Sequence, residues 1–462
     1  MSLWAYTRTM NKQQRLVLVV AILASIIAFL DGSVINVALP AITHEFGGGL
    51  SVQQWVVDAY LVSLGALMLI AGSLSDLFGR KQILNIGLIG FGVTSLLCAI
   101  APGSTFLIIA RVLQGAAAAL LVPSSLALII SEFKGAPQAK AIGSWTAWTG
   151  IAFLVGPLLG GVLVDAGSWR YVFVINVVPI ALTIWLLTNL QSRAASRGKR
   201  ARVDTVGALL CVVALGGPVY ALIEQPHYGW TSPIIYVPLL IGLITWVAFV
   251  WLERRSSHPM ISFDIFKSHN FTVGNIATAA IYAGLALATF LISVFVQQTG
   301  GYSATQAGLA LLPVTIIMFL LSSKFGALSG KYGPRLFMAL GPLISAVGFL
   351  TMLFVDSSVN YLTLLPGILL FGIGLSITVA PLTSAVLGSI NDSVAGIGSA
   401  INNAISRVAG LVAIAAIGVV AAPSLDLAGF HKSAIITSVL MALGGVISMI
   451  WIQNTIKKSN LG

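Results

Sequence analysis

The strongest constraint on this chain is its series of apolar stretches, each long enough to cross a lipid bilayer. A transmembrane helix needs about 20 mostly apolar residues, and fourteen such segments can be counted. Their approximate bounds are 16–39, 52–72, 82–101, 105–131, 141–164, 169–190, 204–224, 233–252, 271–297, 304–323, 335–355, 361–386, 399–422 and 433–453. Only 8% of the 462 residues are charged, whereas soluble proteins carry about 25%. The sequence therefore predicts an all-α integral membrane protein with about 14 transmembrane helices.

The loops between these segments are basic on one side. Lys and Arg collect after the even-numbered segments, at Arg80, Lys81, Lys134, Lys140, Arg193, Arg197, Lys199, Arg200, Arg202, Arg254, Arg255, Lys267, Lys324, Lys331, Arg335, Lys457 and Lys458. The odd-numbered loops carry almost none, with Arg170 and Lys432 as the exceptions. Cytoplasmic loops of membrane proteins are enriched in Lys and Arg, so both termini are expected in the cytoplasm. The net charge of +11 has the same explanation, and binding of nucleic acid is not expected.

A short motif occurs twice. Residues Gly72 to Lys81 and Gly326 to Arg335 both fit G-x-L-S-x-x-x-G-x-[KR], after segments 2 and 10. Eight segments separate them, which two six-helix halves with an inserted helix pair would explain. Repeated halves are typical of secondary transporters, whose substrate site lies near the midplane. The predicted division is an N-terminal half at 1–192, a basic linker with the inserted pair at 193–268, and a C-terminal half at 269–462.

Residue usage argues against catalysis. Cys98 and Cys211 lie inside apolar segments, so they are interpreted as small buried hydrophobic residues rather than a disulfide. The sequence has no C-x-x-C, no paired histidines at metal-ligand spacing, and no nucleophile–base or phosphate-loop pattern. Neither an enzyme nor a metal or organic cofactor is therefore expected.

Five motifs carry a family resemblance. Gly72 to Lys81 is similar to the signature of the major facilitator superfamily between helices 2 and 3, and Arg111 to Gly115 resembles its R-x-x-Q-G motif. Gly150 to Gly161 resembles the G-P-x-x-G-G motif of drug antiporters. Leu30 to Pro40 and Trp169 to Asn176 resemble the fourteen-helix drug:proton antiporter branch. The resemblance implies the major facilitator fold and proton-driven export of organic compounds across the bacterial cytoplasmic (inner) membrane, and we expect a monomer.

Two carboxylates fall inside apolar segments. Burying one in a bilayer costs roughly 2.5–3.5 kcal/mol on insertion scales, so such a residue indicates a proton or cation site. Asp31 is predicted to carry the transported proton; the alternative is a fixed hydrogen bond to a neighbour such as Asn36. Asp58 is predicted to be a second carrier or the counter-charge of a cationic substrate; the alternative is a solvated acid near the outer interface. In having an acid at this position, the chain resembles exporters of quaternary ammonium and other cationic compounds.

Arg111 is the third candidate for proton coupling. An unpaired cation in lipid is costly, so Arg111 must face water or a partner. The resemblance implies that it assists proton transfer, and snorkelling to the outer headgroups is the alternative. Asp76 and Arg80 are interpreted as loop residues of a cytoplasmic latch, in which Gly72 and Gly79 permit a tight turn.

The remaining candidates are a packing motif and possible cavity-lining residues. Gly156, Pro157, Gly160 and Gly161 form a small-residue face that predicts close helix packing, and the functional interpretation is a seal on the outer side. The possible lining residues are Asn36, Tyr60, Trp145, Trp148, Asn402 and Arg407. The two tryptophans also fit an interfacial aromatic belt.

These predictions combine into alternating access, in which the two halves expose a midplane cavity to each side in turn. A lipophilic cation and protons would compete for the same carboxylates. The alternative is an exporter of an anionic or neutral metabolite, lipid or siderophore, for which Arg111 and Arg407 would matter more than Asp58. The expected partners are therefore a small organic substrate, protons and membrane lipids.

Overall fold

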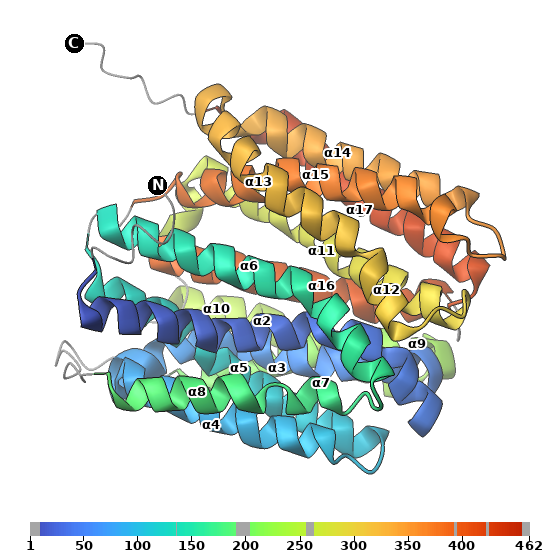
Figure 1. The fold of residues 1–462 in the computed structure, drawn as a ribbon, viewed down its shortest axis with the longest axis horizontal. Helices are drawn as coiled ribbons and strands as arrows, with labels where there is room; N and C mark the ends of the chain where they lie inside the picture. Colours follow the sequence, from blue (N-terminus) through green and yellow to red (C-terminus); the bar gives the residue numbers. More distant parts are fainter. Residues whose placement is uncertain are drawn as a thin grey trace. The chain divides into compact units, whose positions relative to one another are not determined.

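The computed structural model describes residues 10–134, 136–190, 204–255, 263–391, 395–421 and 425–454. Within these ranges the regular elements are helices (Figure 1). They are α2 (Lys12–Phe46), α3 (Gly49–Phe78), α4 (Arg80–Ala99), α5 (Ser104–Glu132), α6 (Ala136–Asp165), α7 (Tyr171–Val174), α8 (Val177–Thr188), α9 (Thr205–Tyr228), α10 (Pro233–Arg255), η1 (Phe263–Lys267), α11 (His269–Gln298), α12 (Ala304–Ala310), α13 (Leu312–Tyr332), α14 (Pro334–Thr351), η2 (Met352–Phe354), α15 (Tyr361–Leu387), α16 (Ala395–Ala421) and α17 (Leu427–Trp451). The basic stretch from Arg193 to Arg202 lies outside the described residues.

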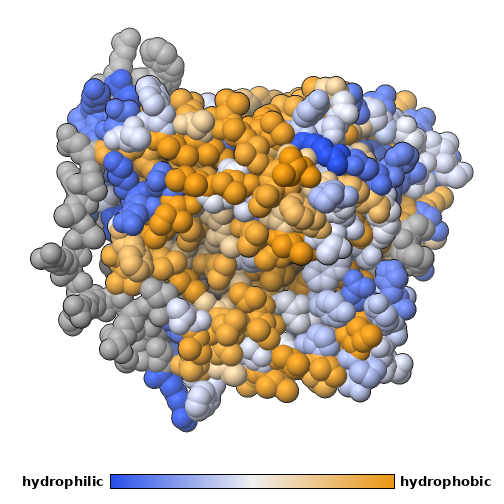
Figure 2. All heavy atoms as spheres, turned by 90° about the horizontal axis from the view of Figure 1, so that it is seen from below, coloured by the Kyte–Doolittle hydropathy of each residue, from blue (hydrophilic) through white to orange (hydrophobic). Residues whose placement is uncertain are grey.

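The helices follow the predicted apolar segments. Among the described residues, thirteen helical stretches are long and apolar enough to cross a membrane, and α3 is a further helix of 30 residues. Segment 169–190 is divided into α7 and α8, and segment 304–323 into α12 and α13. Figure 2 shows apolar residues across the middle of one face and hydrophilic residues toward its two edges. The prediction of an all-α multi-pass membrane protein is confirmed, while the count of fourteen and the cytoplasmic termini stay predictions.

The chain forms two compact units. The first comprises Met1–Met260 with Ser303–Gly308, and the second comprises Ile261–Tyr302 with Leu309–Gly462. In the first unit α2 packs against α5 and α6, α3 against α5 and α9, and α4 against α5 and α8. The inserted helices α9 and α10 pack against each other and cluster with this unit. In the second unit α11 packs against α16 and α17, and α15 against α13 and α14. The predicted three-part division stays a prediction.

The repeated motif has the same geometry in both units. Gly79 (φ 93°) separates α3 from α4, and Gly333 (φ 87°) separates α13 from α14. The basic residue that closes each motif donates to a backbone carbonyl near the C-terminal end of a later helix of the same unit, α8 or α17: Lys81 Nζ lies 2.7 Å from the Leu190 oxygen, and Arg335 Nε lies 2.6 Å from the Met449 oxygen. The internal repeat read from the sequence is therefore also a repeat of contacts.

The prediction that Gly72 to Lys81 forms a loop is wrong. Helix α3 continues through Gly72 and Asp76 to Phe78, and α4 begins at Arg80. A single residue, Gly79, therefore separates the two helices. The apolar side chains at Leu74, Leu77 and Phe78 sustain the helix, and a positive φ ends it because only glycine adopts that conformation without strain. The side chain of Asp76 lies outside the described part of the structure, so the latch stays a prediction.

Candidate functional site

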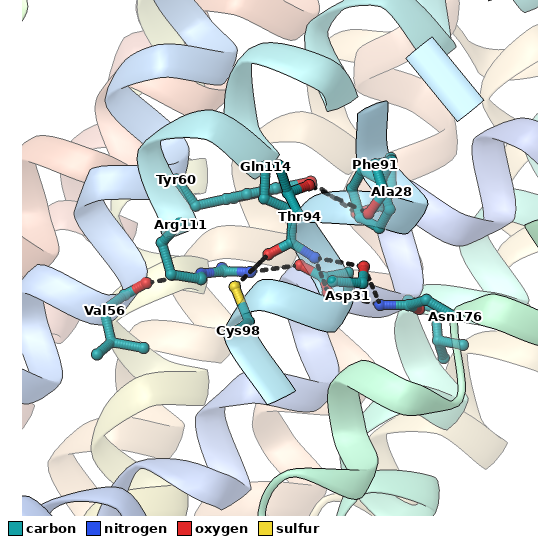
Figure 3. Close-up of polar contacts among 12 residues, drawn as sticks. Ala28, Asp31, Val56, Tyr60, Phe91, Thr94, Cys98, Arg111, Gln114 and Asn176 are labelled. Atoms are coloured by element: carbon teal, nitrogen blue, oxygen red, sulfur yellow. Dashed lines mark hydrogen bonds and ion pairs between the residues drawn. The ribbon is translucent and has the colours of Figure 1, made fainter. Parts of the chain in front are cut away.

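Asp31 lies near the middle of α2 and is almost fully buried, with a side-chain exposure of 1%. Three side chains donate to its carboxylate (Figure 3). Arg111 Nη1 lies 2.6 Å from Oδ2, while Gln114 Nε2 and Asn176 Nδ2 lie 3.0 and 2.9 Å from Oδ1. The acid is therefore held by an ion pair and two amides rather than by Asn36, the neighbour suggested from the sequence.

Arg111 is the largest fully buried side chain of α5, with 0% exposure. Its Nη1 also donates to Gln114 Oε1 at 2.7 Å, and its Nε donates to the Val56 carbonyl of α3 at 2.9 Å. The guanidinium carbon lies 4.2 Å from the centroid of the Tyr60 ring, a favourable position for a cation–π interaction. The Tyr60 hydroxyl donates to the Ala28 carbonyl of α2 at 3.2 Å. Snorkelling to the headgroups is thus wrong, because this arginine connects α2, α3 and α5.

Three members of this cluster, Ser95, Gln114 and Asn176, were not predicted as site residues. Gln114 donates to Ser95 on α4 at 2.9 Å as well as to Asp31, and Asn176, between α7 and α8, reaches Asp31 across the unit. Both are fully buried. Gln114 is the glutamine of R-x-x-Q-G and Asn176 ends the Trp169 motif, so the quoted motifs already contained them. We name these five residues (Asp31, Ser95, Arg111, Gln114, Asn176) the Asp31 cluster.

Asp58 lies on α3 one turn after Trp55 and has 0% exposure. Among the residues that the structure describes, neither of its carboxyl oxygens has a hydrogen-bond partner. The side chain is therefore buried rather than solvated at an interface. It differs from Asp31, whose carboxylate has a cation and two amides around it.

The antiporter motif places α6 directly against the segment of α2 that follows Asp31. A Cβ on Gly156 would collide with the Ser33 hydroxyl, and one on Gly160 would come within 2.5 Å of Val34 Cγ2. Pro157 lies inside α6. Gly161 has Ala304 as its neighbour, in the short segment that clusters with the first unit. The predicted small-residue packing is thus present on α6, and its role as a seal stays a prediction.

The other candidates are dispersed. Asn36 is buried on α2, and its Oδ1 has no partner among the described residues. Trp145 is 5% exposed and donates to Ser25 Oγ at 2.8 Å, so it packs inside the first unit instead of forming an interfacial belt. Trp148 is exposed. None of these three belongs to the Asp31 cluster.

Asn402 and Arg407 belong to the second unit. The Asn402 amide donates to Asn275 Oδ1 and Thr278 Oγ1, both at 3.0 Å, on α11. Arg407 follows on α16 and interacts electrostatically with the Tyr282 hydroxyl of α11. These residues are partly exposed, so α16 carries a polar stripe in the part of the helix that faces α11.

The fold and the buried charges define a class: a multi-pass membrane protein with ionisable side chains buried among its helices. Solved transporters share this fold. A D-xylose–proton symporter matches with a TM-score of 0.66 and 17% identity, covering 95% of this chain and 98% of its own. A peptide transporter POT in complex with sulfate matches with a TM-score of 0.69 and 15% identity, covering 95% and 96%.

The chain belongs to the major facilitator superfamily, whose sequence profile matches residues 21–414. It is 34% identical over 418 residues to the multidrug resistance protein Stp of Mycobacterium tuberculosis (strain CDC 1551 / Oshkosh), covering 90% of this chain and 78% of that protein. It is 32% identical to the methylenomycin A resistance protein of Bacillus subtilis, covering 87% of each. The puromycin resistance protein pur8 of Streptomyces alboniger is 33% identical, with coverages of 87% and 81%. The protein is therefore a multi-pass inner-membrane transporter rather than an enzyme.

Proposed function

We propose that this protein exports drug-like organic compounds from the cytoplasm in exchange for protons. The names of its relatives, which are multidrug and single-antibiotic resistance proteins, support export of drugs. The observation that carries proton coupling is the Asp31 cluster, which contains a buried ion pair, together with a second buried carboxyl at Asp58 on α3. Ionisable residues inside a membrane bundle are expensive and mark proton or substrate pathways.

Asp58 is proposed to carry the exchangeable proton in this conformation. An ionised carboxylate that is fully buried without hydrogen bonds would be very costly, so we assign the proton to it. A conformational change that hydrates Asp58 would release this proton and leave a negative charge. A lipophilic cation can then neutralise that charge, so that proton and substrate compete for one carboxyl.

Asp31 and Arg111 are proposed to act together as the second coupling element. Arg111 binds both the Asp31 carboxylate and the Val56 carbonyl, two residues before Asp58. Protonation of Asp31 would remove its charge and weaken its bond to the guanidinium. Arg111 would then keep its contacts with the Val56 carbonyl and with Gln114, and its positive charge would no longer be neutralised by Asp31. Asp31 can therefore act as a proton carrier only if the bond between Arg111 and Asp31 weakens when Asp31 is protonated.

The proposal is tested by substrate-induced proton release from purified protein in weakly buffered detergent. The probes are tetraphenylphosphonium, ethidium and the dication chlorhexidine. We expect release in the wild type and in the control Glu45→Gln, whose carboxylate lies at the end of α2 outside the Asp31 cluster. Asp58→Asn is expected to abolish release, and Asp31→Asn to reduce or abolish it. Unchanged release in both variants would refute competition at these acids.

One observation favours a second candidate, export of an anionic or neutral compound. Helices α11 to α17 contain no Asp or Glu, while α16 carries Arg407 near its centre and Asn402 five residues earlier. A cationic and an amide side chain on one helix suit a carboxylate or carbonyl group of a substrate. Loss of transport in Arg407→Gln, with transport retained in Asp58→Asn, would favour this candidate over a cation.

A further inference from the structure

Helices α9 and α10 take no part in the proposed exchange of protons and substrate. Nevertheless, α9 is joined to α3 by a specific contact. Trp55 Nε1 on α3 donates to Glu224 Oε1 on α9 at 2.7 Å. The Tyr220 ring, one turn earlier on α9, lies 6.0 Å from the Trp55 ring. A carboxylate acceptor and a short distance make this a charge-assisted hydrogen bond, the stronger kind. Both side chains are partly buried between the helices.

The residue of α3 that follows Trp55 is Val56, whose backbone contacts the Asp31 cluster. The Val56 carbonyl accepts the hydrogen bond from Arg111 Nε at 2.9 Å, and Arg111 in turn binds Asp31 at 2.6 Å. An unbroken path of contacts therefore runs from Glu224 through Trp55 and the α3 backbone to Arg111 and Asp31. Asp58 lies in the same turn of α3 as Trp55, so it depends on the position of the same backbone.

Small displacements of this turn matter for a transport site. Hydrogen bonds weaken steeply with distance and angle, and the Arg111–Val56 bond is made to the backbone, so it cannot be restored by a change of rotamer at Val56. The helix α3 also packs against α2, α4 and α5, which carry the other titratable or charged groups near this turn. Those groups are Asp31, Cys98 and Arg111, together with Tyr60 on α3 and Tyr220 and Glu224 on α9.

We infer that Glu224 is a positioning residue for the transport site: its hydrogen bond to Trp55 fixes the turn of α3 that presents Val56 to Arg111 and carries Asp58. The inserted helix pair is then a support of the transport helices and more than a lipid-facing addition. This inference rests on the proposed function, because it assigns a role within that site. The positioning acts through the hydrogen bond, which the carboxylate charge strengthens, and not through a direct effect of that charge on Asp58.

The test uses three variants of the full-length protein. Trp55→Phe removes the donor and keeps a ring, Glu224→Ala removes the acceptor, and Glu224→Gln keeps an acceptor without the charge. The readout is the pH at which dicyclohexylcarbodiimide, which reacts with protonated carboxyls, labels Asp58 to half its maximum, measured by mass spectrometry of the purified protein. Substrate-induced proton release with tetraphenylphosphonium is measured on the same samples.

We expect the half-labelling pH of Asp58 to move by at least about half a pH unit in Trp55→Phe and Glu224→Ala, and to move clearly less in Glu224→Gln, which keeps a weaker, uncharged acceptor. A shift in Glu224→Gln as large as in Glu224→Ala would overturn the inference, because charge would then be the cause. Unchanged labelling in Trp55→Phe would also overturn it. That variant keeps the packing of the ring and decides the matter if Glu224→Ala does not fold.

The labelling also separates this inference from the proposed function. If the wild type releases no protons but the labelling profiles shift as expected, then proton-coupled export fails and the positioning role stands. If the wild type releases protons normally and all three variants label like the wild type, the positioning role fails and the proposed function stands.

Discussion

Breaking the Asp31–Arg111 pair from either side is expected to destabilise the protein strongly. In Asp31→Asn, the amide that replaces Oδ2 would face Arg111 Nη1, which now lies 2.6 Å from that oxygen, so two donors would oppose each other. The guanidinium, with 0% exposure, would also lose its counter-charge. Removing one partner of a buried pair costs about 3–5 kcal/mol. At roughly 2 °C per kcal/mol, the unfolding midpoint should fall by roughly 6–10 °C.

The double variant Asp31→Asn with Arg111→Gln gives the sharper test. It removes both charges and leaves amides that can hydrogen-bond to Gln114 and Asn176. Its loss of stability should therefore be smaller than the sum of the two single losses, by about 2 kcal/mol or more. Additive losses, or single variants within about 2 °C of the wild type, would refute the energetic reasoning.

The two cysteines provide the assay. Cys98 and Cys211 are free and buried, so a thiol-reactive fluorogenic dye labels them only as the protein unfolds. Cys98 Sγ lies 3.6 Å from Gln114 Oε1 and reports on the Asp31 cluster, whereas Cys211 lies on α9. Measuring each variant with one or the other cysteine replaced by alanine separates local from remote unfolding. The control is Glu45→Gln, which breaks a partly exposed pair with Arg170 and should cost about 0–1 kcal/mol.

Three further predictions concern packing and backbone. Gly156→Ala should reduce transport and cost about 1–3 kcal/mol of stability, because the new Cβ meets the Ser33 hydroxyl, whereas Gly150→Ala has open space and should be neutral in transport and dye-labelling assays. Gly79→Ala should destabilise by about 1–3 kcal/mol, since its φ of 93° and ψ of 131° strain any residue with a Cβ; an unchanged midpoint would contradict this. Lys81→Met removes the cap on the end of the first half and should cost about 1 kcal/mol, measured by the same unfolding assay.

The helices were predictable from the sequence because membrane spans need long apolar runs and tolerate few charges. The same physics singled out Asp31, Asp58 and Arg111, since each charge in such a run is expensive. What the pattern could not supply is the pairing: Asp31 and Arg111 are 80 residues apart in the chain. Only the packing of α2 against α5 brings them together.

Gln114 and Asn176 escaped the prediction of site residues for a related reason. An amide in an apolar segment is much cheaper to bury than a charge, so nothing in the hydropathy pattern sets it apart. The interpretation of Gly72 to Lys81 as a loop was wrong because its glycines suggested a flexible turn. In the structure the apolar residues between them keep α3 helical, and Gly79 alone makes the break.

The paired contacts of Lys81 and Arg335 have a consequence for how this chain accommodates insertions. Lys81 and Arg335 are the second residues of α4 and α14, and each binds a backbone carbonyl near the C-terminal end of a later helix, α8 or α17. The exit point of the chain is thus fixed before the next segment starts. We expect residues added after Leu190 to lengthen the connection to α9 without loosening the helices from α2 to α8. The repeated contact therefore marks a position where added helices are tolerated, and α9, which begins at Thr205, is the next described helix after it.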